Sequence, residues 1–303
     1  MPATRYVTTS DGVNVAYMSV GQGPPIVFAS NFGGDVHNYH APITHVRGMT
    51  DSLVRLGFQV LLHDTRGMGA SDRDIADWCL DARLRDLDAV VTELGVHRFA
   101  LVGADHGAPT AISYAARHPE RVSHLALICP WATGAGPYAL SAVRIISAPP
   151  NASAEWKVFA NVLGSVVTEF ADPSRSRAVA ESLQRTVSAQ GLAAYHRASI
   201  AIDLRECLSR VTAPTLIVHE PTFPFGSLEL CQEVAAGIAN ASLAVVYERF
   251  MIGESFDETV TAIDRLLRPD ATSNGATERS RPGAWRRPSR WPCCVLRSWR
   301  RYS

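Results

Sequence analysis

The sequence lacks several features that would place it in a membrane, secreted or metal-binding class. Its first residues contain no apolar leader segment, and no window is apolar over the length that crosses a bilayer. Its six cysteines show neither metal-ligand spacing nor the spacing of a disulfide framework. These absences favour a cytoplasmic protein with no membrane partner, no metal site and no resident cofactor.

The chain also lacks net charge, because 29 basic side chains balance 29 acidic ones. The two signs are unevenly spread: residues 271–303 hold eight arginines against one acid, Glu278, a net +7 that leaves −7 on residues 1–270. A mildly acidic body argues against nucleic acid as a partner. The stretch 269–303 has no helical or strand period, which predicts a disordered basic tail.

What the chain does contain is a strand, a tight turn and a helix around Asp105. Residues 99–102 are an apolar run typical of a buried strand, Gly103-Ala104-Asp105-His106-Gly107 follows, and a helical pattern continues to Ala116. Glycines on both sides allow a strained bend that presents Asp105 at the N-terminus of the helix, where backbone N–H groups favour negative charge. A carboxylate there can attack an alkyl carbon or activate water, but it is a poor acyl-transfer nucleophile.

Residues 102–109 (Val-Gly-Ala-Asp-His-Gly-Ala-Pro) and 117–122 (Arg-His-Pro-Glu-Arg-Val) resemble the epoxide hydrolase and dehalogenase branch of the α/β-hydrolase family. The resemblance implies an α/β-hydrolase fold, with a mostly parallel central sheet, flanking helices and a helical cap insertion. It divides the chain into a first core segment (1–130), a cap (131–206) and a second core segment (207–268). Within the cap, periodicity predicts helices over 152–170, 174–189 and 191–205.

In the resembled family, backbone N–H groups form an oxyanion hole beside the nucleophile. By position, the donors here would be His106, which follows Asp105, and Phe32, in the loop after the apolar strand 25–29. The turn Asp64-Thr-Arg-Gly67 also matches the family, and we expect Asp64 and Arg66 to form an ion pair there.

The cap region supplies weaker candidates for contact with substrate. Tyr138 and Tyr195 could donate a hydrogen bond to an epoxide oxygen, and Trp131 and Trp156 could wall the pocket. His196 is expected to be solvated on a polar helix, and a ligand or base role is the weaker interpretation.

Two members of the expected catalytic triad are missing. No histidine follows His219, and the nearest carboxylate to the acid position, Glu220, comes three residues early, with Phe223 near the expected place. Three alternatives remain open. Asp105 acts as a base on water, the site does not turn over, or a histidine arrives from elsewhere, namely His37, His40, His106 or His196.

We therefore expect an enzyme that uses Asp105 on a small, largely apolar substrate, most simply an epoxide hydrolase-like ring opening by water. A reaction of the esterase, lyase or cyclase kind, with Asp105 as general base, is the first alternative. A non-catalytic ligand-binding protein is the second. The sequence does not fix the oligomeric state, and a homodimer stays open.

Overall fold

The computed structural model describes residues 3–31, 35–37, 39, 45–139, 153–168, 170, 172–248 and 256–269. Residues 1–268 cluster into one compact unit, and residues 269–303 are grouped apart from it. The predicted disordered tail lies, from residue 270 onward, outside the described residues.

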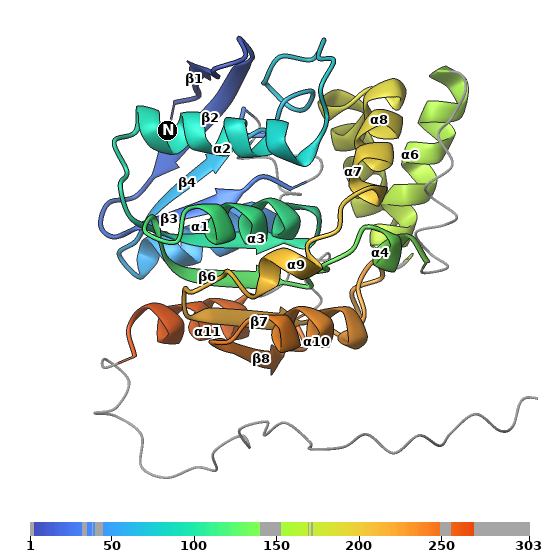
Figure 1. The fold of residues 1–303 in the computed structure, drawn as a ribbon. Coiled ribbons are helices and arrows are strands. Elements are labelled where there is room, and N and C mark those ends of the chain that lie inside the picture. Colours follow the sequence, from blue (N-terminus) through green and yellow to red (C-terminus); the bar gives the residue numbers. More distant parts are fainter. Residues whose placement is uncertain are drawn as a thin grey trace, which may run out of the picture. The chain divides into compact units, whose positions relative to one another are not determined.

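An eight-stranded sheet runs through the compact unit in the order β1-β2-β4-β3-β5-β6-β7-β8 (Figure 1). Neighbouring strands from β4 to β8 are parallel, whereas β2 pairs antiparallel with β1 and with β4. The strands are β1 (Arg5–Thr8), β2 (Asn14–Val20), β3 (Pro25–Ala29), β4 (Gln59–His63), β5 (Phe99–Ala104), β6 (Val122–Ile128), β7 (Thr215–His219) and β8 (Ala241–Val245). The predicted α/β fold with a mostly parallel sheet is confirmed.

Helices cover both faces of this sheet, as parallel strands require. The helices are α1 (His45–Arg55), α2 (Leu80–Glu93), η1 (Asp105–Gly107), α3 (Ala108–Arg117), α4 (Ala135–Ala139), α6 (Ser153–Val167), α7 (Pro173–Thr186), α8 (Ala189–Ile200), α9 (Arg205–Leu208), α10 (Leu228–Gly237) and α11 (Asp257–Leu267). Helix α2 begins at Leu80, because Asp77 accepts the N–H of Cys79 and the Cys79 sulfur caps the first turn.

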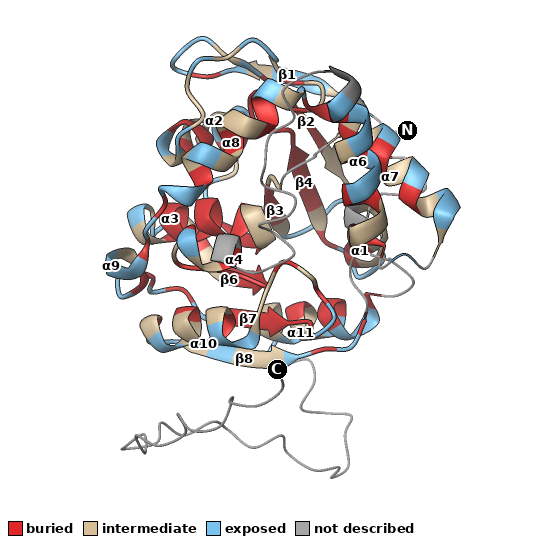
Figure 2. Cartoon of the chain, turned by 90° about the vertical axis from the view of Figure 1, so that its right-hand side faces the viewer, coloured by how far each residue is buried: buried red, intermediate tan, exposed pale blue. Residues whose placement is uncertain are grey.

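The central strands are buried on both faces, as Figure 2 shows along β3, β4, β6 and β7. Alternate side chains of one strand therefore enter two different cores. In β3, for example, Val27 packs with residues of α2, α3 and α10, whereas Ile26 and Phe28 pack with residues of α1 and α11. This arrangement makes the carboxyl ends of the strands a rigid edge on which loop residues can be positioned.

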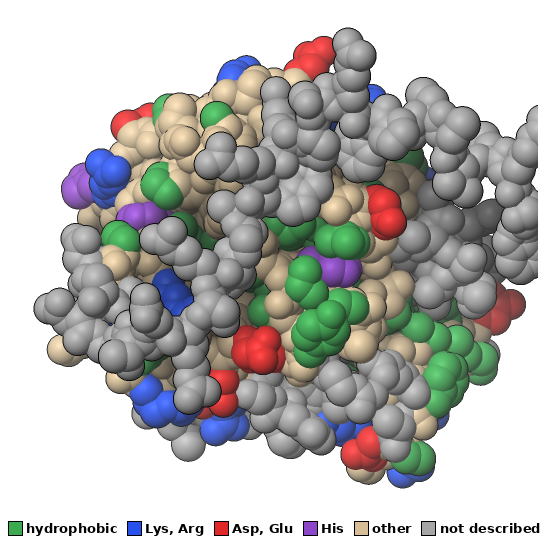
Figure 3. Space-filling view, turned by 90° about the horizontal axis from the view of Figure 1, so that it is seen from below, with side chains coloured by type: hydrophobic (Ala, Val, Ile, Leu, Met, Phe, Trp, Pro, Cys, Tyr) green, Lys and Arg blue, Asp and Glu red, His purple; other side chains and the backbone are tan. Residues whose placement is uncertain are grey.

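The two margins of the sheet differ. At one margin, β1 and β2 form a hairpin, in which Gly12 has a φ of +86° and Thr9 accepts its N–H. At the other margin, β8 and the residues after it expose Val245 and Tyr247, and apolar side chains reach the surface on this side of the molecule (Figure 3). Asp105 directly follows β5, which lies between these margins.

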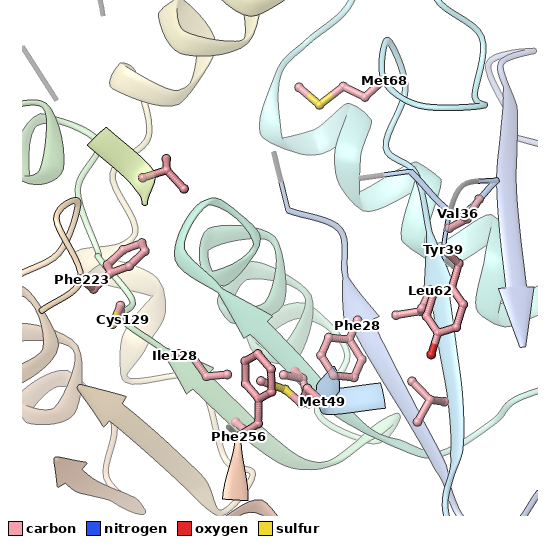
Figure 4. Close-up of a cluster of buried hydrophobic side chains, with 14 of the residues drawn as sticks. Phe28, Val36, Tyr39, Met49, Leu62, Met68, Ile128, Cys129, Phe223 and Phe256 are labelled. Atoms are coloured by element: carbon pink, nitrogen blue, oxygen red, sulfur yellow. The ribbon is translucent and has the colours of Figure 1, made fainter. Parts of the chain in front are cut away.

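The core on the α1 and α11 side extends to the carboxyl ends of the strands. Figure 4 shows Phe28, Met49, Ile128 and Phe256 converging there, with Phe223 beside Cys129 further along. Phe256 also sets how closely its helix approaches α1, because a Cβ at Gly48 would lie 2.7 Å from its ring.

Helices α4 and α6 to α9 are inserted between β6 and β7, in the region predicted to form a cap. Helices α6, α7 and α8 lie within or close to the predicted spans and stand together to one side of the sheet (Figure 1). Their role as a cap over the nucleophile remains a prediction.

The expected ion pair between Asp64 and Arg66 was wrong. Arg66 is buried and binds Asp11 at 2.7 Å and Asp86 at 2.8 Å. Asp64 instead accepts backbone N–H groups from Val36 and Ala70. The two residues are only two positions apart in the sequence, but the turn directs Arg66 to carboxylates and Asp64 to backbone N–H groups.

Candidate functional site

Asp105 lies at the point where β5 ends and the chain turns into η1 and α3. Its φ is +44°, in the left-handed region that L-residues other than glycine rarely adopt. Backbone strain of this kind costs about 1–3 kcal/mol and persists only where the surrounding structure enforces it. The strained elbow predicted from the sequence is therefore present, with an aspartate at its tip.

Two glycines make this bend sterically possible. A Cβ at Gly107 would lie 2.6 Å from the carbonyl oxygen of Ala29 on β3. A Cβ at Gly103 would lie 2.7 Å from the Cβ of Ala111 on α3. Both distances are shorter than real contacts allow, so the elbow can pack against β3 and α3 only with glycine at these positions.

The carboxyl group of Asp105 is enclosed although the residue as a whole is partly exposed. Its Oδ1 atom has no solvent contact and, in the described part of the chain, no hydrogen-bond partner. Burial raises the pKa of Asp105 to about 7, and the backbone N–H of His106 and the indole of Trp131 act in the opposite direction. The carboxyl therefore titrates near neutral pH. Its Oδ1 makes no structural hydrogen bond with the described residues.

Trp131 reaches this carboxyl from the segment after β6. Its side chain is fully buried, and its Nε1 has no hydrogen-bond partner among the described residues. Cys129, two residues before Trp131, also has a left-handed backbone, with a φ of +46°. Trp131 was predicted as a pocket wall; the structure adds an indole N–H whose influence extends to Asp105.

The ring of His106 lies inside the same cluster. Its centroid is 5.8 Å from that of Trp131, 5.5 Å from that of Tyr195 and 6.1 Å from that of His196. Burial lowers the pKa of His106 well below its usual value, and the positive charges of His196 and Arg83 lower it further. A neutral imidazole therefore stands directly after the elbow aspartate.

Helix α8 supplies two of these rings. Tyr195 is 1% exposed, and burial raises its pKa, so its hydroxyl stays protonated at neutral pH. His196 is only partly exposed and is stacked nearly parallel to His106, with 12° between the planes. Burial lowers the pKa of His196 to about 4. The expectation that His196 would be solvated was wrong, because α8 turns this face toward the elbow.

Sequence reasoning missed Arg83, which joins the cluster from α2. Its guanidinium lies over the ring of Tyr195, with Cζ 3.9 Å from the centroid, and the side chain is buried. The available signal was its position, since residue 83 falls on the same face of α2 as the apolar Leu80 and Leu87. An arginine on a buried helix face needs a specific partner.

A family model described as the alpha/beta hydrolase fold matches residues 24–224. The chain belongs to the α/β-hydrolase family. A cis-3-alkyl-4-alkyloxetan-2-one decarboxylase of Shewanella oneidensis is 25% identical over 243 residues, which cover 78% of this hydrolase and 70% of that protein. A bifunctional epoxide hydrolase 2 of Rattus norvegicus is 25% identical over 123 residues, 40% of this chain and 21% of that one.

Solved structures show the same architecture. A bromoperoxidase from Bacillus anthracis superposes with a TM-score of 0.75 at 16% identity, covering 88% of this α/β-hydrolase and all of that chain. The predicted resemblance is thus confirmed at the level of the family, within which epoxide hydrolases are one of several groups of relatives.

Neither the acid nor the histidine of the expected triad is found at its usual place in this α/β-hydrolase. After β7, Glu220 is buried and accepts hydrogen bonds from the N–H and hydroxyl of Thr222. Phe223, near the expected acid position, is an apolar side chain in the core. The loop after β8 is described to residue 248, and residues 220–303 contain no histidine at all. The elbow therefore has no triad histidine at the usual place.

Of the remaining predicted residues, some are described and others lie outside the described part of the chain. Trp156, on α6, is 9% exposed and stacks on Phe159, with 5.7 Å between centroids. Tyr138 belongs to α4, but its side chain is outside the described part, as are the whole of Phe32 and His40. His37 is exposed.

The described residues show neither a cluster of metal ligands nor a helix that could span a membrane. Among the described residues, no group of three or more histidine, cysteine, aspartate or glutamate side chains could hold a metal ion. No helix in the described ranges combines the length and apolar character needed to cross a bilayer.

Proposed function

We propose that this α/β-hydrolase opens the strained oxygen ring of a small, largely apolar substrate, an epoxide in the simplest case, and that Asp105 acts as a base on the attacking water. The observation that carries the proposal is the enclosed carboxyl at the elbow, whose Oδ1 has no hydrogen-bond partner in the described structure. A group that titrates near pH 7 is suited to take a proton at neutral pH.

The absence of a triad histidine favours base action over covalent catalysis. If Asp105 attacked the ring carbon itself, it would form an ester, and a second base would have to activate water to break that ester. His106 and His196 have lowered pKa values, which makes them weak proton acceptors. Direct attack by water needs only one base.

In the proposed step, Asp105 takes a proton from water as the water oxygen bonds to a ring carbon and the ring carbon–oxygen bond breaks. Tyr195 donates its hydroxyl proton to the released ring oxygen and then recovers a proton from Asp105. The product is a diol. Support for Tyr195 as donor comes from its burial, its protonated state at neutral pH and its proximity to Asp105, whose charge raises the pKa of Tyr195.

Two relatives support a strained oxygen ring as the substrate. The Shewanella oneidensis protein is named for an oxetan-2-one, a four-membered oxygen ring, and the Rattus norvegicus protein is named for an epoxide. Aromatic rings around the elbow, those of Trp131, Tyr195 and His106, match a largely apolar substrate body.

A single-turnover reaction in heavy-oxygen water tests the base assignment. Enzyme in excess is mixed with styrene oxide, and the diol and the Asp105 peptide are weighed by mass spectrometry. We expect heavy oxygen in the diol from the first turnover and none in Asp105. An unlabelled first diol with a labelled Asp105 would show covalent catalysis instead, and tight binding without product would favour a ligand-binding protein.

A further inference from the structure

Arg83 is a buried cation that the proposed chemistry does not use. Its side chain is 3% exposed, and it links α2 to α8 through Nη2, which donates to Ser199 Oγ at 3.0 Å and to the carbonyl oxygens of Trp78 and Tyr195 at 3.3 and 3.5 Å. All three acceptors are neutral. These bonds hold α8 in place, but none of them brings a negative charge to the guanidinium.

Arg66 shows how this chain ordinarily buries an arginine. Arg66 is 2% exposed, and it is bound by the carboxylates of Asp11 and Asp86. Arg83 forms no salt bridge with any carboxylate of the described residues, and its Nε and Nη1 have no hydrogen-bond partner there. A buried charge without a counter-ion is strongly unfavourable, so a position that keeps one calls for an anion from elsewhere.

The guanidinium belongs to the same cluster as the elbow. Its charge lowers the pKa of His106 and of His196, and its Cζ lies 3.9 Å from the ring centroid of Tyr195, which is in turn 5.5 Å from that of His106. Around this guanidinium the described structure therefore gathers two imidazoles and a phenol but no carboxylate that binds it.

We propose that Arg83 is an anion subsite that binds a carboxylate on the substrate. The substrate class is then a small acid with an apolar body and a strained ring, its carboxylate on Arg83 and its ring at Asp105. The ring part rests on the proposed function, whereas the anion part does not. Nε and Nη1 have no solvent contact in the structure without ligand, so binding of the carboxylate requires a shift of the side chains that cover the guanidinium.

Binding of benzoate and of its neutral isostere benzamide tests the subsite without any turnover. By isothermal titration of the full chain, we expect benzoate to bind at least about tenfold more tightly than benzamide, because charge-assisted hydrogen bonds are the stronger ones. Arg83→Met should remove that preference, and Arg83→Lys should keep part of it. Equal binding of the two probes by the unaltered protein would overturn the proposal.

Arg85→Met is the matched control, since Arg85 lies on the same helix but is already paired with Asp11 and Asp77. It should leave the preference for benzoate unchanged. Should Arg83→Met melt early but bind benzoate and benzamide as the unaltered protein does, Arg83 only ties α2 to α8 and the subsite does not exist.

Kinetics then separate this inference from the proposed function. We expect kcat/KM for 3-phenylglycidate, an epoxide that carries a carboxylate, to exceed that for styrene oxide by about tenfold, with the difference lost in Arg83→Met. Turnover of both epoxides at the same rate would overturn the subsite and keep the ring-opening function. A benzoate preference without turnover of either epoxide would keep the subsite and overturn the function.

Discussion

Two aspartates at the carboxyl ends of β4 and β5, which β3 separates in the sheet, differ in what holds them. Asp64 follows β4 and Asp105 is the first residue after β5, and burial raises the pKa of each to about 7. Asp64 is tied down, since it accepts the N–H of Val36 at 3.0 and 3.2 Å and that of Ala70 at 2.9 Å. Asp105 has an Oδ1 without a partner in the described structure. A raised pKa alone therefore does not identify a catalytic carboxyl; its bonds do.

Loss of the charge on Asp105 should reduce activity more than any other change considered for these two aspartates. Asp105→Asn keeps the size of the side chain and, because asparagine tolerates a left-handed backbone, keeps the elbow. General-base help is worth about 10²–10⁴-fold, so kcat/KM for styrene oxide should fall by that factor. Unchanged turnover, with circular dichroism showing a folded protein, would remove Asp105 from the mechanism.

Truncation of Asp64 should affect stability and leave the chemistry intact. Asp64→Ala leaves the N–H groups of Val36 and Ala70 without their acceptor, at about 1–3 kcal/mol for each buried group. Urea denaturation should therefore show a loss of about 2–6 kcal/mol. The comparison variant is Asp105→Ala, for which we expect no such loss. Equal losses for both variants would contradict the assignment of different roles.

Much of this fold could be predicted from the sequence because its signals are local. Apolar runs mark the buried strands, and the glycines that flank Asp105 mark the elbow. These features depend on neighbours within a few residues. The position of Asp105 was therefore predictable, and its left-handed backbone follows from the same spacing.

The partners of the site could not be predicted because they depend on how distant helices pack. Arg66 is paired with Asp11, 55 residues away, and not with nearby Asp64. His196 and Arg83 come from α8 and α2, and only their packing shows that both face His106. A helical period gives the face of a helix, but it does not say which element that face meets.

The pH dependence of stability offers a second comparison. The carboxyl of Asp105 has a pKa of about 7 when folded, against 3.8 as its ordinary value. Between these values the folded state holds a proton that the unfolded state has lost, so stability falls as pH rises from about 4 to 7. Asp105→Asn should therefore be more stable than the unaltered protein at pH 8, by about 4 kcal/mol, and about equally stable at pH 4.

Thermal melts at pH 4 and pH 8 measure this difference. Asp64 is present in both proteins and contributes the same trend to each, so it cancels from the comparison. A variant that gained as much stability at pH 4 as at pH 8 would show that relief of backbone strain, and not loss of a buried charge, is responsible.

The pH dependence of activity should report the same carboxyl. A base must be ionised to accept a proton, so kcat/KM for styrene oxide should rise about tenfold per pH unit below pH 7 and level off above it. Rates between pH 5 and pH 9 give this profile. A rise centred near pH 4 instead would mean that the Asp105 carboxyl is not desolvated in the working enzyme.

The smallest effect concerns the indole of Trp131, which lowers the pKa of Asp105 but forms no hydrogen bond in the described structure. Trp131→Phe removes this N–H, so the acid limb of the pH–rate profile should move upward by a few tenths of a unit. Trp156→Phe, a buried tryptophan stacked on Phe159, should not move it. A shift in both variants, or in neither, would mean that desolvation alone sets the titration of Asp105. In that case Asp105 and Asp64 would differ only in the bonds that hold Asp64.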